Sequence, residues 1–262
     1  MLGSANQNVM IKAARAAGRS LVKDFREVEN LQVSSKGAGD FVSKAEISAE
    51  EIIRDMLMEA RPTYGWLGGG SKAVEGADPT RRWIVSALDG LTNFLHGLPH
   101  WALSIALEHK GEIVSCVIFD PAKGELFWAE KGSGSWMNDT RIRVSGRTRL
   151  VDGIFATGLP NGGKSDLPDT LRDLARVLPA CSGVRHWGAP ALDLAFVAAG
   201  RFDGYWERRM KPWEIAAGVL LVKEAGGFIE PIDTSNSIVE DGEVVCANEA
   251  LFERFAAIIR GA

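Results

Sequence analysis

The sequence predicts an α+β protein in which layers of helix and sheet form one continuous sandwich. Three observations predict it: apolar residues at helical spacing near the N-terminus, short apolar or alternating segments separated by turns in the middle, and alternating strands and helices after about residue 150. We expect a single domain over residues 1–262, with an α+β half up to about residue 150 and an α/β half after it.

The N-terminal part predicts two helices and a loop. Apolar residues recur at helical spacing from Val9 to Phe25. A second helix is expected from about Lys44 to Ala60, and Pro62 ends it. A glycine-dense loop is expected from Gly65 to Gly76.

The middle of the chain predicts an antiparallel meander, because apolar or alternating segments follow one another across short glycine-containing turns. The expected strands are Trp83–Leu88, Trp101–Glu108, Glu112–Asp120 and Glu125–Glu130, with a further one over Arg141–Val144.

The second half predicts alternating helices and strands. The expected helices are Leu167–Leu178, Ala191–Ala199, Trp213–Ala225 and Glu249–Arg260. The expected strands are Val184–Trp187, Tyr205–Glu207, Phe228–Ile229 and Val244–Cys246. Gly226 follows the third helix, in the position where glycine commonly ends one.

Composition excludes several classes of protein. Hydrophobic residues make up 46% and charged residues 24%, as in ordinary globular proteins. A formal charge of -4 disfavours a general nucleic-acid binder. Three scattered cysteines without metal spacing favour a reducing compartment, and no apolar run is long enough to span a membrane. The first residues lack the apolar centre of a signal peptide, so we expect a cytoplasmic protein.

Three segments carry polar groups suited to chemistry. One apolar strand ends at Asp89, and Gly90 beside it would let backbone N–H groups approach an anion. In the second segment, Pro212 begins a helix and Glu214 falls in its first turn. In the third, an extended stretch at 40–46 leads into a helix whose first turn contains acids. Each has a structural alternative, namely a turn, a helix cap and a charged helix start.

Together, the segments resemble in order and spacing the motifs of the inositol monophosphatase family. Ser86–Phe94 is similar to the family's Asp-Pro-(Ile/Leu)-Asp-Gly-Thr-Thr-Asn-Phe, and Trp213–Gly218 to its Trp-Asp-x-x-Ala-Gly. Phe119–Pro121, Gly188–Asp193 and Gly204–Glu207 extend the resemblance over nearly the whole chain. It implies an αβαβα layered sandwich, Mg²⁺-dependent hydrolysis of inositol phosphates and related sugar phosphates, and a homodimer.

The metal-binding positions that the resemblance implies are largely altered here. Asp89 alone matches a ligand outright, while Glu46 and Glu214 stand where the family has Asp. The longer side chain moves the carboxylate by roughly an ångström or more, and such misplacement can cost about a hundredfold in rate. Ser86 is a lost ligand position, and Gly69 stands where the family has a metal-binding Glu. Since Mg²⁺ requires anionic oxygen ligands, we expect its binding to be weak or absent.

The catalytic and substrate positions differ in how well they survive. Leu91 stands where the resemblance places the Thr that orients the attacking water, so Leu91 and Gly69 occupy positions of lost catalytic groups. The substrate positions that the resemblance implies are Gly90, Leu91, Thr92, Ala189, Asp193 and Glu207. Backbone N–H groups at 90 and 91 need no particular side chain, so a polyol or phosphate could bind without being cleaved.

Two functions remain open from the sequence. The main expectation is a family protein with lost or strongly reduced phosphatase activity and a binding or regulatory role, with a phosphorylated polyol or another protein as partner. The alternative is an active Mg²⁺-dependent phosphatase on inositol 1-phosphate or a related sugar phosphate, in which an acid such as Glu75 completes an atypical metal site. An unrelated binding module and a deliberately inactivated variant explain the motifs less well.

Overall fold

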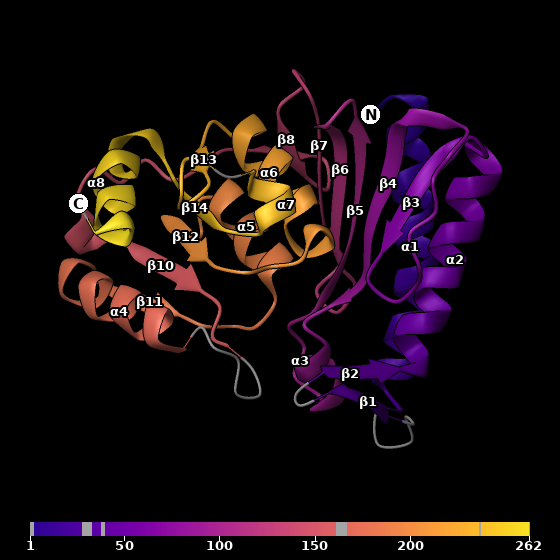
Figure 1. Ribbon diagram of the computed structural model, residues 1–262, viewed down its shortest axis with the longest axis horizontal. Helices are drawn as coiled ribbons and strands as arrows, with labels where there is room; N and C mark the ends of the chain where they lie inside the picture. The colour runs from indigo at the N-terminus through magenta and orange to yellow at the C-terminus, as the bar shows by residue number, and fades with distance from the viewer. Residues whose placement is uncertain (1–2, 28–32, 38–39, 161–166, 236, 262) are drawn as a thin grey trace.

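Five layers follow one another in the order helix, sheet, helix, sheet, helix, as Figure 1 shows. The computed structural model describes residues 3–27, 33–37, 40–160, 167–235 and 237–261, with the backbone alone for 33–37 and 40–43. The expected αβαβα sandwich is therefore confirmed.

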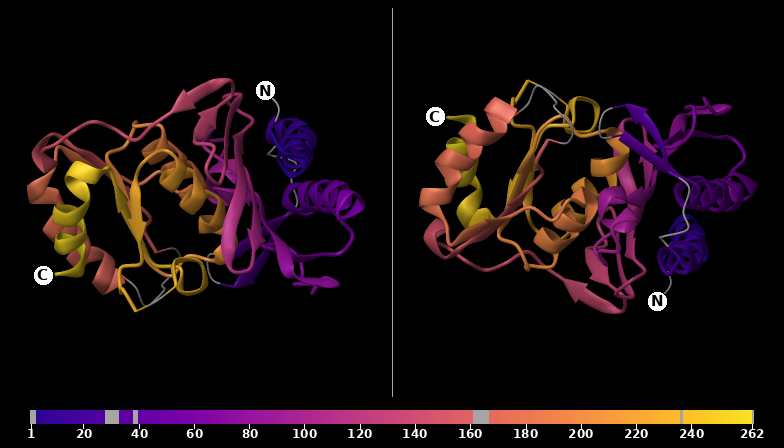
Figure 2. Two further views of the ribbon diagram at one scale, coloured as in Figure 1. Left: turned by 90° about the horizontal axis from the view of Figure 1, so that it is seen from above. Right: turned by 90° about the horizontal axis from the view of Figure 1, so that it is seen from below.

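The first layer consists of helices α1 (Ala5–Phe25) and α2 (Lys44–Ala60), which cover one face of the larger sheet (Figure 2). The Ser4 hydroxyl accepts the N–H of Gln7 and so caps α1. Both helices bury an apolar stripe against the sheet, which stabilises them as part of one core. A short antiparallel hairpin, β1 (Val33–Gly37) and β2 (Asp40–Ser43), joins them.

The larger sheet contains seven strands in the order β3-β4-β5-β6-β7-β8-β9. They are β3 (Tyr64–Gly68), β4 (Asp78–Asp89), β5 (Ala102–His109), β6 (Glu112–Asp120), β7 (Glu125–Glu130), β8 (Ser135–Met137) and β9 (Thr140–Ile142). From β4 onward each strand pairs antiparallel with the next, so the predicted meander is confirmed. The predicted loop from Gly65 is wrong at its start, because β3 adds to the sheet in parallel with β4.

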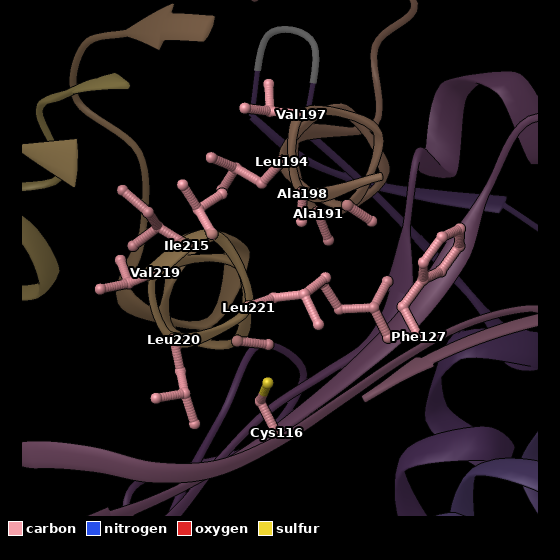
Figure 3. Packing of buried hydrophobic residues seen from close by; sticks show 14 of the residues in the cluster. Cys116, Phe127, Ala191, Leu194, Val197, Ala198, Ile215, Val219, Leu220 and Leu221 are labelled. Atoms are coloured by element: carbon pink, nitrogen blue, oxygen red, sulfur yellow. The ribbon is translucent and has the colours of Figure 1, made fainter. Parts of the chain in front are cut away.

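The central layer is formed by α5 (Pro190–Ala198) and α6 (Pro212–Glu224), packed between the two sheets. Residues 191–198 of α5 and 215–222 of α6 are all buried, which explains why these stretches are apolar on nearly every side. Figure 3 shows Leu194 of α5 and Leu221 of α6 in this core, with Phe127 and Cys116 of the larger sheet facing them. Gly218 lets the helices approach, since a Cβ there would lie 2.3 Å from Cδ1 of Leu194.

The smaller sheet has five strands in the order β11-β10-β12-β14-β13. They are β10 (Ile154–Thr157), β11 (Gly183–Arg185), β12 (Gly204–Glu207), β13 (Phe228–Glu230) and β14 (Val244–Ala247). Helices α4 (Leu167–Val177) and α8 (Glu249–Arg260) cover its outer face through an aromatic core. Short elements complete the chain: α3 (Leu91–Leu95), α7 (Ile238–Asp241) and the 3₁₀ turns at Leu150–Asp152 and Leu178–Ala180.

No helix in the described part of the chain is both long enough and apolar enough to cross a membrane.

Candidate functional site

A cleft of about 330 Å³ opens where β4, β12 and the N-terminal ends of α5 and α6 meet. This volume lies at the lower end of the range for small-molecule sites. Of the site residues predicted from the sequence, those that line the cleft are Glu46, Gly69, Ser86, Asp89, Gly90, Leu91, Thr92, Asp193, Glu207 and Glu214. Ala189 is fully buried behind this wall and does not line it, and Glu75 is not among the lining residues.

The end of β4 fixes the position of Asp89. Gly90 follows with φ of 79°, a conformation that costs other residues energy, and α3 begins at once. A Cβ at Gly90 would also lie 3.0 Å from the carbonyl oxygen of His100 and 3.2 Å from Cβ of Ala189. Glycine is therefore required both by the turn and by the close approach of the neighbouring chain.

Asp89 caps a helix that is distant in the sequence. Its Oδ2 accepts the N–H of Ala191 at 2.9 Å, in the first turn of α5, where Ala189 offers no capping side chain. Burial raises the pKa of Asp89 well above its ordinary value, and the charges of Glu214 and Glu207 raise it further. The one carboxylate that matches the metal motif outright thus has one oxygen bound to backbone.

Glu214 also has a structural role. Its Oε2 accepts the backbone N–H of Lys211 at 2.6 Å, in a capping box at the start of α6. The structural alternative considered for Glu214, a helix cap, is therefore present in the same residue that lines the cleft.

The glycine loop after β3 carries no acid at the cleft. A Cβ at Gly69 would lie 2.9 Å from Nε1 of Trp213, so the indole edge occupies the space beside this residue. Gly70 donates its N–H to Oε2 of Glu50 at 2.7 Å, and the side chain of Glu50 is only 4% exposed. The loop is held by α2 on one side and contacts Trp213 on the other.

These side chains do not fit a magnesium site that depends on several carboxylates. Gly69 and Ser86 supply no charged ligand, while Asp89 and Glu214 each have an oxygen bound to a backbone N–H. Within the described residues, no group of three or more His, Cys, Asp or Glu side chains could hold a metal ion. A Mg²⁺ ion, which demands near-octahedral oxygen ligation, would have to keep most of its own waters here.

The side of the cleft formed by β12 and the start of α5 is a largely buried acidic cluster. Tyr205 donates its hydroxyl to Oε2 of Glu207, and Gly158 leaves room for that carboxylate, since a Cβ there would lie 1.9 Å from Oε1. Burial, followed by the charges of Glu207 and Asp89, raises the pKa of Asp193 well above its ordinary value. The cluster offers oxygens that can accept hydrogen bonds from ligand hydroxyls.

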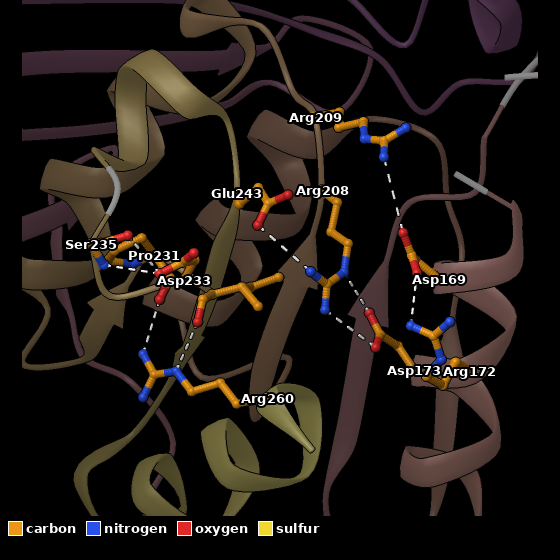
Figure 4. A network of polar contacts seen from close by, with 11 residues as sticks. Asp169, Arg172, Asp173, Arg208, Arg209, Pro231, Asp233, Ser235, Glu243 and Arg260 are labelled. Carbon is orange, nitrogen blue, oxygen red and sulfur yellow. Dashed lines mark hydrogen bonds and ion pairs between the residues drawn. The ribbon is translucent and has the colours of Figure 1, made fainter. Parts of the chain in front are cut away.

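The basic residues that follow β12 lie at the rim of the cleft and are engaged with acids (Figure 4). Arg208 Nε lies 2.9 Å from Asp173, and Nη1 lies 3.6 Å from Glu243. Arg209 lies 4.0 Å from Asp169. Asp169 and Asp173 come from α4, and Glu243 directly precedes β14.

Other cleft residues were not predicted as part of a site. Trp213, Thr157 and His186 line it, and Nδ1 of His186 lies 3.2 Å from the carbonyl oxygen of Thr157. Trp213 could have been suspected, since it directly precedes Glu214 in the resembling motif.

Comparisons with known proteins agree with this architecture. A model of the inositol monophosphatase family matches residues 5–262. The chain is 49% identical over 260 residues to an inositol-1-monophosphatase of Rhizobium meliloti, covering 99% of this chain and 98% of the relative. It is 52% identical over 251 residues to an inositol-1-monophosphatase of Mesorhizobium japonicum, covering 96% and 94%. The crystal structure of extragenic suppressor protein suhB from Bartonella henselae superposes with a TM-score of 0.95 at 48% identity, covering 98% of this chain and 99% of that one.

Proposed function

Because the chain belongs to the inositol monophosphatase family, we propose that its cleft binds a small polyol or polyol phosphate and that its phosphatase activity is strongly reduced. The observation that carries this proposal is a contrast within one cleft. The polyol-side residues Asp193 and Glu207 line it, whereas the positions at Gly69, Ser86 and Leu91 lack the groups that the family motif places there.

Two lines of evidence support different parts of the proposal. The curated relatives that are about half identical are named inositol-1-monophosphatases, which supports the ligand class. The residues at positions 69, 86 and 91 support the reduced rate of phosphate hydrolysis. Without a charged ligand at Gly69 and Ser86, a metal would contribute little to transition-state charge stabilisation, and Leu91 has no hydroxyl to orient a water.

A second candidate is an active Mg²⁺-dependent phosphatase on inositol 1-phosphate or a related sugar phosphate. The names of the relatives favour it, and they favour it more than they favour a loss of activity. Glu46, Asp89 and Glu214 would then be the acids around an atypical metal site. Glu75 is exposed and outside the cleft, so it does not support this candidate in its present position.

Phosphate release from inositol 1-phosphate distinguishes the two. The parent is assayed with Mg²⁺ and with Mn²⁺ beside a variant that carries Gly69→Glu, Ser86→Asp and Leu91→Thr. The matched control is Asp89→Ala, because phosphate release that persists in this variant does not come from the cleft. We expect the parent to be at the level of Asp89→Ala and the triple variant to exceed both.

The opposite result would support the second candidate. A parent that turns over on the order of once per second or faster, and loses this rate in Asp89→Ala, is an ordinary enzyme. The homodimer and a protein partner remain predictions of the family resemblance, and light scattering coupled to size exclusion measures the first of them.

A further inference from the structure

We propose that a groove between α1 and the β6–β7 hairpin docks an acidic segment of another protein that carries one apolar side chain. The groove shares no lining residue with the cleft, so the inference does not depend on the proposed function. Two features carry it: an apolar floor, and two arginines beside this floor that pair with no acid in the described part of the chain.

The groove has a volume of about 360 Å³ and lies on the side of the larger sheet that α1 covers, opposite to α5 and α6 (Figure 1). Helix α1 packs directly against the hairpin at Gly18, because a Cβ there would lie 2.6 Å from Cε1 of Phe119. The apolar lining comes from Val22 of α1 and from Phe119, Pro121 and Leu126 of the hairpin. An apolar side chain placed against these residues would remove their remaining surface from water.

The charged residues of the groove are Arg15 and Arg19 of α1. They are one helical turn apart, so they lie on the same face of the helix, and both are exposed. Among the residues that the structure describes, neither forms a hydrogen bond, an ion pair or a cation–π contact. Like charges at this spacing destabilise a helix slightly, and an acid bound between them would offset their repulsion.

The positive charge continues along α1 beyond the groove. Lys12 and Lys23 lie on the same exposed face as the two arginines, and the row from Lys12 to Lys23 is about 16 Å long at about 1.5 Å per residue. The one acid in the sequence of α1, Asp24, lies about 140° around the helix from Arg19, at about 100° per residue. It interacts there with Lys23 rather than with the arginines. The row is thus long enough to contact several acids of an extended segment.

The acids of the hairpin are engaged by other cations. Asp120 pairs with Lys123 at 2.6 Å, and Glu125 pairs with Arg201 at 2.5 Å. Asp139 is exposed and does not line the groove. The groove therefore favours a negatively charged ligand, although the whole chain has a formal charge of -4.

Charge and shape together select one kind of occupant. A nucleic acid would match the charge but would leave the apolar floor uncovered. A flat anionic membrane would not reach Leu126, which is only 3% exposed. An acidic peptide segment with one apolar side chain matches both the row of cations and the floor.

Calorimetric titration with a synthetic peptide tests the inference, and the probe is a short, end-blocked run of glutamates around one central leucine. We expect the parent protein to bind it, and to bind about tenfold more weakly when serine replaces the leucine. Glutamine in place of the glutamates should weaken binding at least as much, and so should a rise in salt concentration weaken it.

The double variant Arg15→Gln, Arg19→Gln should weaken binding of the glutamate peptide about two- to thirtyfold, the effect of two exposed ion pairs. Because neither arginine has a contact within the described residues, its Tm should not fall below that of the parent, which separates a lost contact from misfolding. The matched control is Arg254→Gln, because Arg254 is an exposed arginine of α8 in the opposite outer layer (Figure 1).

Several results would overturn the inference. They are no binding by the parent at millimolar peptide, unchanged affinity in the double variant, and equal affinity for the serine peptide. Tighter binding of a DNA oligonucleotide or of phosphatidylglycerol vesicles would also overturn it. Helix α2 carries exposed acids at Glu51, Asp55 and Glu59, so self-association that is lost in the double variant would assign the groove to a second copy of this chain instead. Each of these results leaves ligand binding at the cleft unaffected.

Discussion

Replacing Asp193 by Asn should stabilise the protein at neutral pH. Asp193 is 1% exposed, and its Oδ1 has no partner among the described residues. Folding raises the pKa of this carboxyl, and a rise of one pH unit in that pKa costs about 1.4 kcal/mol of stability once the pH exceeds the folded pKa. Asn keeps the shape but cannot ionise, so we expect Asp193→Asn to raise the free energy of unfolding by about 1–3 kcal/mol near pH 7.

The pH dependence gives this prediction a signature. Burial and the charges of Glu207 and Asp89 raise the pKa of Asp193 well above its ordinary value. Between the unfolded pKa of about 3.9 and this raised value, the folded state therefore binds more protons than the unfolded state. The contribution of Asp193 is fully present below the unfolded pKa and is lost as the pH rises toward the folded pKa. The advantage of Asn should thus be near zero at about pH 4 and grow with pH.

Thermal unfolding in metal-free buffers from about pH 4 to pH 8 measures the difference. At about 2–4 °C per kcal/mol for a chain of this size, the expected gain is readily detected. The control is Asp152→Asn, because Asp152 is an exposed carboxylate whose pKa is lowered, chiefly by a hydrogen bond from Arg149. A lower Tm for Asp193→Asn at neutral pH, or a gain of the same size at both ends of the range, would refute the reasoning.

Four further predictions concern other parts of the molecule. Burial, with a smaller effect of Lys123, lowers the pKa of His100 to about 4. The free energy of unfolding should therefore fall as the pH is lowered from about 6.5 to about 4. Unfolding curves measured over this pH range should show a smaller loss for His100→Gln. Asp203 is buried, accepts hydrogen bonds from the Ser145 hydroxyl and the backbone N–H of Ile154, and forms an ion pair with Arg147. Asp203→Ala should therefore lower the free energy of unfolding by about 3 kcal/mol or more, as measured by denaturant unfolding. Gly218→Ala should cost about 1–3 kcal/mol by the same measurement, because its Cβ would meet Leu194. A ligand present at or below its Kd raises the free energy of unfolding by no more than about 0.4 kcal/mol. Because we expect weak Mg²⁺ binding, millimolar Mg²⁺ should leave the Tm of the parent protein nearly unchanged.

Helix boundaries were predictable where caps mark them. Helices α2 and α8 run over Lys44–Ala60 and Glu249–Arg260, as the sequence indicated. Asn248 caps α8 through its side chain, and Gly261 follows the helix with φ of 78°. These interactions are local, so the sequence contains all the information they need.

Elements that depend on distant partners were missed. Strand β3 lies in a segment where glycine gives no alternating pattern, and it becomes a strand only because Trp66 pairs with Trp83 on β4. The hydrogen bond from Ala191 to Asp89 joins residues 102 positions apart, so no local pattern could indicate it. The motif placed Asp89 in the cleft, but its second role as a cap came only from the fold.

Three positions that differ from the family motif, Leu91, Gly69 and Ser86, fit the packing and charge around them. Leu91 packs against the core between α1, α2 and the larger sheet, and Gly69 leaves the space that the edge of Trp213 approaches. Ser86 adds no charge beside Asp89, whose pKa is already raised by burial and, to a smaller extent, by neighbouring carboxylates. A further acid at Gly69 would therefore need a shift of Trp213, and an acid at either Gly69 or Ser86 would add negative charge close to Asp89. Packing at Gly69 and charge at both positions thus match the residues that the sequence has.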